Sequence, residues 1–113
     1  MKVIIAGSRD FNDYELLSKT VNESNIKITE IISGTARGAD RLGERYAKEN
    51  KIEIKRFPAE WEKFGRQAGY LRNKQMAEYG DALIAFRIDK SKGTSHMIEL
   101  ARKNNLQVIV VEI

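Results

Sequence analysis

The 113-residue sequence contains no cysteine and only one histidine, His96. Without cysteine there is neither a disulfide framework nor a thiolate metal site, and with a single histidine we expect no bound metal. The lack of cysteine fits a reducing compartment, so we expect a cytoplasmic location. Long apolar runs are missing too. The N-terminal run stops at Gly7, which is too short for a signal peptide or a membrane span.

No internal repeat, low-complexity tract or linker divides the chain, so we expect one domain over residues 1–113. A hydrophobic fraction of 42% and a charged fraction of 32% are typical of a globular protein that buries a core without metals or disulfides. The formal net charge of +4 suits a polyanionic partner or a phosphorylated small ligand. A mildly basic solvated surface explains it equally well, because acidic residues occur throughout the chain.

Apolar segments alternate with helical patterns along the whole chain. We expect strands at residues 3–6, 28–33, 52–57, 81–86 and 107–111, with helices between them. The third strand alternates apolar and charged residues, which indicates a position near a sheet edge. Between Trp61 and Tyr79 we expect an irregular start and then a firm helix from about Ala68. This alternation predicts an α/β fold in which helical layers cover both faces of a mainly parallel five-stranded sheet.

The segment from Ser33 to Asp40, with the sequence SGTARGAD, connects the second strand to a helix. Its glycines allow close approach of the backbone to a ligand, and free N–H groups at a helix start favour an anion. The alternative is a tight connection that binds nothing. Two more loops rich in Gly, Ser, Thr and Arg follow strands, at residues 7–10 and 87–94. In parallel sheets ligands bind beyond the carboxyl ends of the strands, so we expect these three loops to form one crevice suited to phosphate and ribose.

Four motifs together carry a resemblance that extends over nearly the whole chain: GSRDF at residues 7–11, the turn at residues 33–40, GYLRN at residues 69–73, and KGTSHM at residues 92–97. In this order they resemble the SLOG superfamily, specifically its YspA-type, cpYpsA-related branch. The resemblance implies a Rossmann-like αβα sandwich that recognises nucleotides or nucleotide-derived ligands, often as a sensor. It implies no required cofactor beyond a nucleotide-like ligand.

The same superfamily contains the LOG phosphoribohydrolases, which cleave nucleoside monophosphates. Matching their motifs places Arg72 at the arginine of an Arg-Lys pair, with Asn73 in place of the lysine. The Gly-Thr of their glycine-rich loop falls on Gly93 and Thr94, and their glutamate falls on Met97. A thioether exchanges no proton, so this comparison implies ligand binding without hydrolysis. Nucleotide N-glycosidase activity that uses a different acid remains an alternative, with Arg72 as its catalytic residue.

We expect the ligand, and in particular its phosphate, to be bound by residues from all four motifs. They are Gly7, Ser8, Arg9, Ser33, Gly34, Thr35, Arg37, Gly38, Asp40, Arg72, Asn73, Gly93, Thr94 and His96. Some of these have a structural alternative. Arg37 either binds phosphate or shields its own helix, and Asp40 either accepts ribose hydroxyls or fixes the turn. His96 lies in the first turn of a helix, where the helix dipole favours its neutral form.

The expected partners are a nucleotide-derived small molecule and a second copy of the chain, and no membrane. The turn at residues 33–40 also resembles the DNA-processing protein A family, which binds single-stranded DNA. Such binders add exposed aromatic residues to a basic groove. We place most aromatic side chains in core-like positions and only Phe11 and Tyr70 near the crevice, so nucleic acid is the less favoured partner. Trp61 is expected in the core or, with Phe64, at a contact between copies.

Overall fold

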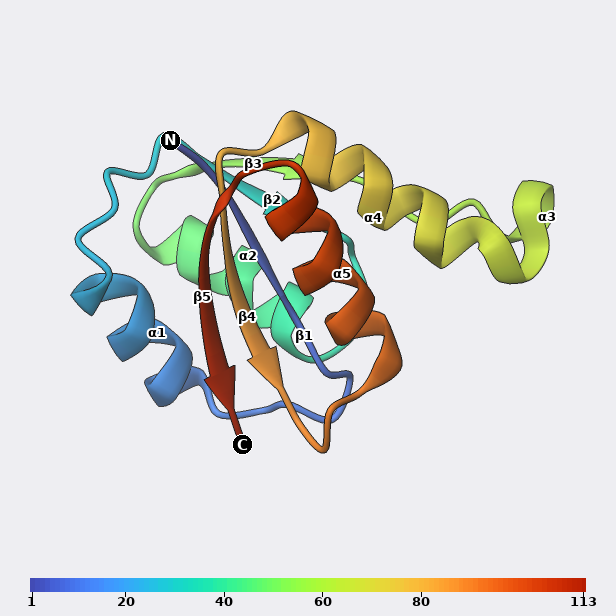
Figure 1. Cartoon of the computed structure of the whole chain (residues 1–113). Coiled ribbons are helices and arrows are strands. Elements are labelled where there is room, and N and C mark those ends of the chain that lie inside the picture. The colour runs from blue at the N-terminus through green and yellow to red at the C-terminus, as the bar shows by residue number, and fades with distance from the viewer.

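The computed structural model describes residues 1–113 and shows a sheet enclosed by helices (Figure 1). In chain order the elements are β1 (Lys2–Gly7), α1 (Tyr14–Glu23), β2 (Glu30–Ser33), α2 (Ala39–Glu49), β3 (Glu53–Arg56), α3 (Trp61–Phe64), the 3-10 turn η1 (Gly65–Gln67), α4 (Ala68–Tyr79), β4 (Ala82–Arg87), α5 (Lys92–Lys103) and β5 (Gln107–Glu112). The strand order is β3-β2-β1-β4-β5, and all neighbouring strands are parallel. The predicted α/β fold is confirmed, with a sheet that is parallel throughout.

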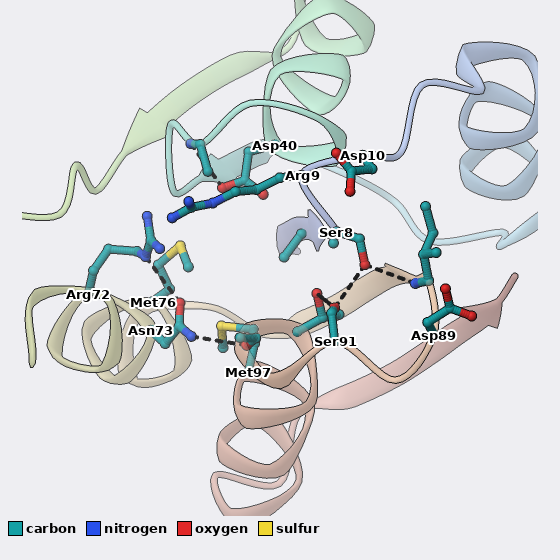
Figure 2. A pocket seen from close by; sticks show the side chains of 16 residues that line it. Ser8, Arg9, Asp10, Asp40, Arg72, Asn73, Met76, Asp89, Ser91 and Met97 are labelled. Atoms are coloured by element: carbon teal, nitrogen blue, oxygen red, sulfur yellow. Dashed lines mark hydrogen bonds between the residues drawn. The ribbon is translucent and has the colours of Figure 1, made fainter. Parts of the chain in front are cut away.

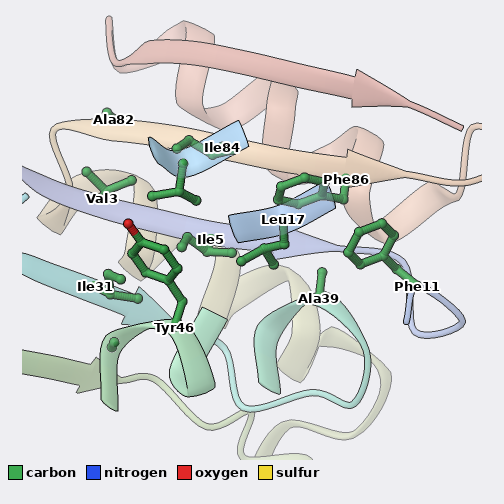
Figure 3. Close-up of a cluster of buried hydrophobic side chains, with 12 residues drawn as sticks. Val3, Ile5, Phe11, Leu17, Ile31, Ala39, Tyr46, Ala82, Ile84 and Phe86 are labelled. Carbon is green, nitrogen blue, oxygen red and sulfur yellow. The ribbon is translucent and has the colours of Figure 1, made fainter. Parts of the chain in front are cut away.

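Side chains of the central strands alternate between two hydrophobic clusters, one on each face of the sheet. Val3 and Ile5 of β1 belong to the cluster beneath α1 and α2 (Figure 3), whereas Ile4 and Ala6 belong to the cluster beneath α4 and α5. Both faces of β1 and β4 are therefore covered, which explains their continuous apolar sequences. The two clusters form the core on which the loops at the carboxyl ends of the strands are held.

β3 forms a polar edge of the sheet. The β3 edge, predicted from its alternating sequence, is confirmed, and all of its residues except Ile54 are exposed. β2 starts at Glu30, two residues later than predicted, because its first ladder partner is Lys2 at the start of β1.

No helix in the structure has the length and apolar character required to cross a bilayer.

The segment before α4 is irregular, as predicted: α3 and η1 precede a regular helix from Ala68. Figure 1 shows α3 projecting away from the body of the molecule. Neither α3 nor η1 contains a buried residue, and Trp61 is 50% exposed and Phe64 41% exposed. The expectation of core-like positions is wrong for these two side chains, because the α3 segment extends past the edge of the cluster that α4 covers.

Phe11 is a second correction among the aromatic residues. It is only 3% exposed and stacks on Phe86 with ring centroids 4.8 Å apart, so it belongs to the core (Figure 3). The loop after β1 turns back over the sheet and buries this ring. Phe11 therefore stabilises the loop that follows β1 and offers no stacking surface to a ligand.

Candidate functional site

The main cavity lies beyond the carboxyl ends of the strands and has a volume of about 460 Å³ (Figure 2). Three loops and parts of β1, α2, α4 and α5 line it. The lining residues are Ala6 and Gly7 at the end of β1, Ser8, Arg9 and Asp10 after β1, Ala36 after β2, Asp40 from α2, Arg72, Asn73 and Met76 from α4, Ile88, Asp89 and Ser91 after β4, and Gly93, Thr94 and Met97 from α5. The structure thus brings together the three loops that the topology argument placed at one crevice.

The strand order explains this position. β1 has β2 on one side and β4 on the other, so the chain leaves β1 and β4 in opposite directions. Such a reversal opens a crevice between the loops that follow the two strands. Gly7 pairs in register with Phe86, and the N–H of Ser8 donates to the carbonyl of Phe86 at 2.9 Å. The two loops therefore start at the same level of the sheet.

Hydroxyl groups join the loop after β1 to the start of α5. Ser8 Oγ lies 2.8 Å from Ser91 Oγ and accepts the N–H of Ile88 at 2.8 Å. Ser91 Oγ in turn donates to Thr94 Oγ1 at 3.0 Å. These hydroxyls hold the first turn of α5 at the cavity, where its leading N–H groups have no partner within the helix. Gly93 and Thr94 line the cavity at this point.

The turn from Ser33 to Asp40 is fixed by its own contacts. Ser33 Oγ is buried, donates to Glu44 Oε2 at 2.6 Å and accepts the N–H of Thr35 at 3.0 Å. Gly38 has a φ of +84°, and a Cβ there would lie 2.4 Å from the carbonyl oxygen of Ser8. This glycine is needed because the turn packs directly against the loop after β1.

Arg72 connects α4 to this turn. Its Nη1 donates to the carbonyl oxygen of Gly34, and its Nε donates to Asn73 Oδ1 at 3.1 Å. A Cβ at Gly34 would lie 2.8 Å from Arg72 Nη1, so the glycine leaves space for the guanidinium. Arg72 is thereby held beside the cavity by two hydrogen bonds that involve no carboxylate.

Two guanidinium groups, those of Arg9 and Arg72, face the same cavity (Figure 2). Neither takes part in any of the four ion pairs, which join Arg37 to Asp10, Arg45 to Glu49, Arg56 to Glu44 and Arg87 to Glu112. Burial lowers the pKa of Arg72, the charge of Asp40 acts against this shift, and the positive charge of Arg9 adds to it. Two guanidinium groups that face one cavity and belong to no ion pair are suited to bind the oxygens of an anion.

Asp40 lies next to these arginines and is 5% exposed. Its Oδ2 accepts the N–H of Ala36 at 3.2 Å, so this carboxyl does fix the turn. Burial raises its pKa from 3.8 to about 6, and the charge of Glu44 adds to the rise, whereas Arg72 and the Ala36 N–H act against it. Asp40 therefore titrates near neutral pH while lining the cavity.

His96 lies behind the cavity and does not line it. Its Nδ1 is 3.3 Å from Asn73 Nδ2, and its ring meets Tyr70 edge-on at 4.6 Å between centroids. Burial lowers the pKa of His96, which favours the neutral ring that its position at a helix start predicts. Asn73 also donates to the carbonyl of Gly93 at 3.4 Å, so His96 and Asn73 together tie α4 to α5.

Of the sequence-predicted site residues, the structure brings eight to the cavity: Gly7, Ser8, Arg9, Asp40, Arg72, Asn73, Gly93 and Thr94. Six lie outside its lining: Ser33, Gly34, Thr35, Arg37, Gly38 and His96. Ser33 and Gly34 are buried at the start of the turn. Arg37 is exposed and pairs with Asp10 in the loop after β1 at 3.6 Å.

Several lining residues were not predicted from the sequence. Asp10, Asp89 and Ser91 belong to loops that were predicted to form the crevice, but the sequence of a polar loop does not reveal which of its side chains turn inward. Met76 had a usable signal, since it follows Arg72 by four residues and so shares its helix face. Met97, which occupies the position of the LOG glutamate, does line the cavity.

Chemically, the cavity offers two guanidinium forks, helix-start N–H groups, hydroxyls and the carboxyl groups of Asp10, Asp40 and Asp89. No group of three or more His, Cys, Asp or Glu side chains is arranged to hold a metal ion. Fold and site together define a Rossmann-like domain with a polar cavity at the switch point of a parallel sheet.

Comparison with known proteins assigns the family. The profile of the YspA, cpYpsA-related SLOG family (YAcAr) matches residues 1–64. The gene 61 protein of Mycobacterium phage D29 is 32% identical over 118 residues, which cover 96% of this chain and 94% of that protein. The chain belongs to the YspA, cpYpsA-related SLOG family. No solved structure gives a significant match. Membership of the family indicates, at a general level, a nucleotide-related ligand.

Proposed function

We propose that the protein binds a nucleotide or a nucleotide-derived phosphorylated small molecule in the main cavity, as a sensor or ligand-binding module without hydrolysis. The observation that carries this proposal is the pair of guanidinium groups, Arg9 and Arg72, which face one cavity and belong to none of the four ion pairs. We assign the phosphate to these arginines and the adjoining start of α5, where N–H groups point away from the helix. A volume of about 460 Å³ suits a ligand of mononucleotide size.

The test is a binding measurement with the four nucleoside 5′-monophosphates, using the four unphosphorylated nucleosides as controls. Arg9 is the better residue to change, because it is exposed and forms no ion pair, so Arg9→Gln leaves the fold intact. Loss of its contact to phosphate weakens binding by about tenfold to a hundredfold, as for a charge-assisted hydrogen bond. Arg102→Gln, an equal charge change on the exposed side of α5, is the matched control. Equal binding by Arg9→Gln and wild type contradicts the proposed phosphate position.

The absence of hydrolysis in this proposal rests on Met97. Its side chain is almost fully buried at the cavity, where a LOG enzyme has its glutamate, and a thioether neither donates nor accepts a proton in catalysis. Glu99 is exposed and does not line the cavity. We expect no free base after incubation with nucleoside monophosphates. Release of base that disappears in Arg72→Gln would establish the N-glycosidase alternative.

Exposed aromatic side chains favour a second candidate function, binding of single-stranded nucleic acid. Trp61, Phe64 and Tyr70 are all exposed, and Lys63 and Arg66 lie on the same segment. Aromatic and basic side chains together are the usual surface for unpaired bases. This candidate is supported if a single-stranded oligonucleotide binds in a salt-dependent way, if mononucleotides do not displace it, and if Trp61→Ala abolishes the binding.

We also propose that the same aromatic surface forms a contact between two copies of the chain. Sedimentation of the wild type and of Phe64→Ser tests this contact.

A further inference from the structure

Three carboxyl groups line the cavity, those of Asp10, Asp40 and Asp89, and Asp40 is the buried one among them. It is 5% exposed, lines the cavity, and lies between the turn at Ala36 and the guanidinium of Arg72. A negative charge at this point opposes a bound phosphate, so its presence in a phosphate site requires an explanation.

Glu44, one turn further along α2, shows how the same protein neutralises a carboxyl that serves only the fold. Its Oε1 pairs with Arg56 Nη2 at 3.0 Å, and its Oε2 accepts the hydroxyl of Ser33 at 2.6 Å. Asp40 has no comparable ion pair, and its carboxyl accepts hydrogen bonds only from the backbone N–H groups of Ala36 and Gly7. These contacts fix the turn beside β1 without an ion pair that neutralises the carboxyl, so the charge that Asp40 places at the cavity is unexplained.

We propose that Asp40 and the bound phosphate share one proton, so that the cavity selects a terminal phosphate monoester over oxyanions that carry no titratable proton. This inference rests on the proposed function, and it adds the class of phosphate. A phosphodiester, as in nucleic acid or a cyclic nucleotide, offers no such proton. A monoester does, because its second ionisation occurs near neutral pH.

The chemistry balances without any further reactant. One proton, brought either by the phosphate or by Asp40, lies in an O–H···O hydrogen bond between the carboxyl and a phosphate oxygen. Arg9 and Arg72 then face the remaining phosphate oxygens. If neither group carries the proton, two anions repel each other in a poorly solvated site. The same repulsion makes two neighbouring carboxyl groups share a proton. The other charged group facing Asp40 is Glu44, which is already paired with Arg56.

Inorganic phosphate and sulfate form a matched pair of probes. Both are tetrahedral and doubly charged at pH 8, but only phosphate still carries a proton there. Amide NMR titrations at pH 6.5 and pH 8.0, following Gly34, Ala36 and Asp40, give the affinity of each anion. In the wild type we expect sulfate to lose about tenfold in affinity for each pH unit, because its complex must take a proton from solvent. Phosphate does not weaken over this range, because the dianion that predominates at pH 8.0 brings the shared proton itself, whereas the monoanion at pH 6.5 must first release one. The preference for phosphate therefore grows with pH.

Asp40→Asn keeps an oxygen that accepts the Ala36 N–H and removes the titratable proton. In this variant we expect both anions to bind alike and with no such pH trend. Asp13→Asn is the matched control, since Asn and Asp cap helices equally well and Asp13 caps α1 without lining the cavity. Should Asp40→Asn fail to fold, the wild-type comparison of the two anions decides alone.

The outcomes separate the two proposals. Binding of both anions with equal affinity at both pH values overturns the shared proton and leaves phosphate binding in place. Binding of neither anion at either pH overturns the proposed function and the shared proton together. A preference for phosphate that persists unchanged in Asp40→Asn assigns the selectivity to another group and overturns the role of Asp40.

Discussion

Replacing Asp40 with asparagine is predicted to change how the stability of the protein depends on pH. Burial raises the pKa of Asp40 from 3.8 to about 6 in the folded protein. The folded state therefore holds this proton more tightly than the unfolded chain does. As pH rises between about 4 and 6, the unfolded chain loses its proton first, and the free energy of unfolding falls.

The magnitude follows from the gap between the two pKa values of Asp40, 3.8 and about 6. One pKa unit corresponds to about 1.4 kcal/mol, so ionising Asp40 costs the fold about 3 kcal/mol at pH 7. The linkage relation places about 2 kcal/mol of this cost between pH 4.5 and pH 7. The amide of the Asp40→Asn variant does not titrate, so the stability of this variant relative to wild type rises by that amount over this range.

Urea denaturation at pH 4.5, 5.5, 6.2 and 7.0 measures the difference between the two proteins. Other titrating groups are common to both and cancel in the difference. Asp13→Asn, which changes an exposed carboxyl, is expected to show a much flatter difference over this range. A flat difference for Asp40→Asn as well means that Asp40 ionises as it does in water, and the argument from its burial is then wrong.

Three further predictions test the fold around the site. Gly38→Ala destabilises the protein by about 2 kcal/mol or more in urea denaturation, since φ is +84° there and a Cβ meets the Ser8 carbonyl; an unchanged midpoint would show that the turn relaxes freely. Ile84→Ala, in the cluster beneath α1 and α2, costs about 3 kcal/mol by the same measurement, and a cost below about 1 kcal/mol would contradict tight packing there. Tyr14 ionises near its pKa of about 12, because burial and its hydrogen bond to Glu49 disfavour the phenolate; an ultraviolet titration in which Tyr14→Phe removes a step near 10 instead would refute this.

Local sequence patterns predicted the elements well where packing agrees with them. β1 and β4 are covered on both faces, so their apolar runs mark them without ambiguity. The irregular start before Ala68 was also predictable, because Gly65 and Gly69 weaken a helix. Asn105, two residues after the end of α5, has a φ of +60°, the left-handed conformation that asparagine commonly adopts just after a helix.

Aromatic residues show where pattern reasoning failed. Trp61 and Phe64 have helical spacing and therefore resemble core residues, but spacing defines a face of a helix without showing whether anything covers it. The structure exposes both and buries Phe11, which lies in a polar loop. Which of these rings is buried depends on how far α3 projects and on how the loop after β1 folds back.

By itself, the sequence determined the order of strands and helices, the three loops at the carboxyl ends of the strands and most of the polar residues in them. These features depend on local periodicity and on turn residues a few positions apart. Only the tertiary structure decided which side chains share the cavity. Arg72 binds the carbonyl of Gly34, 38 residues earlier, and stands beside Arg9 and Asp40. Such proximity, and the burial that raises the pKa of Asp40, arise from packing α4 and α2 against the same end of the sheet, which no local pattern encodes.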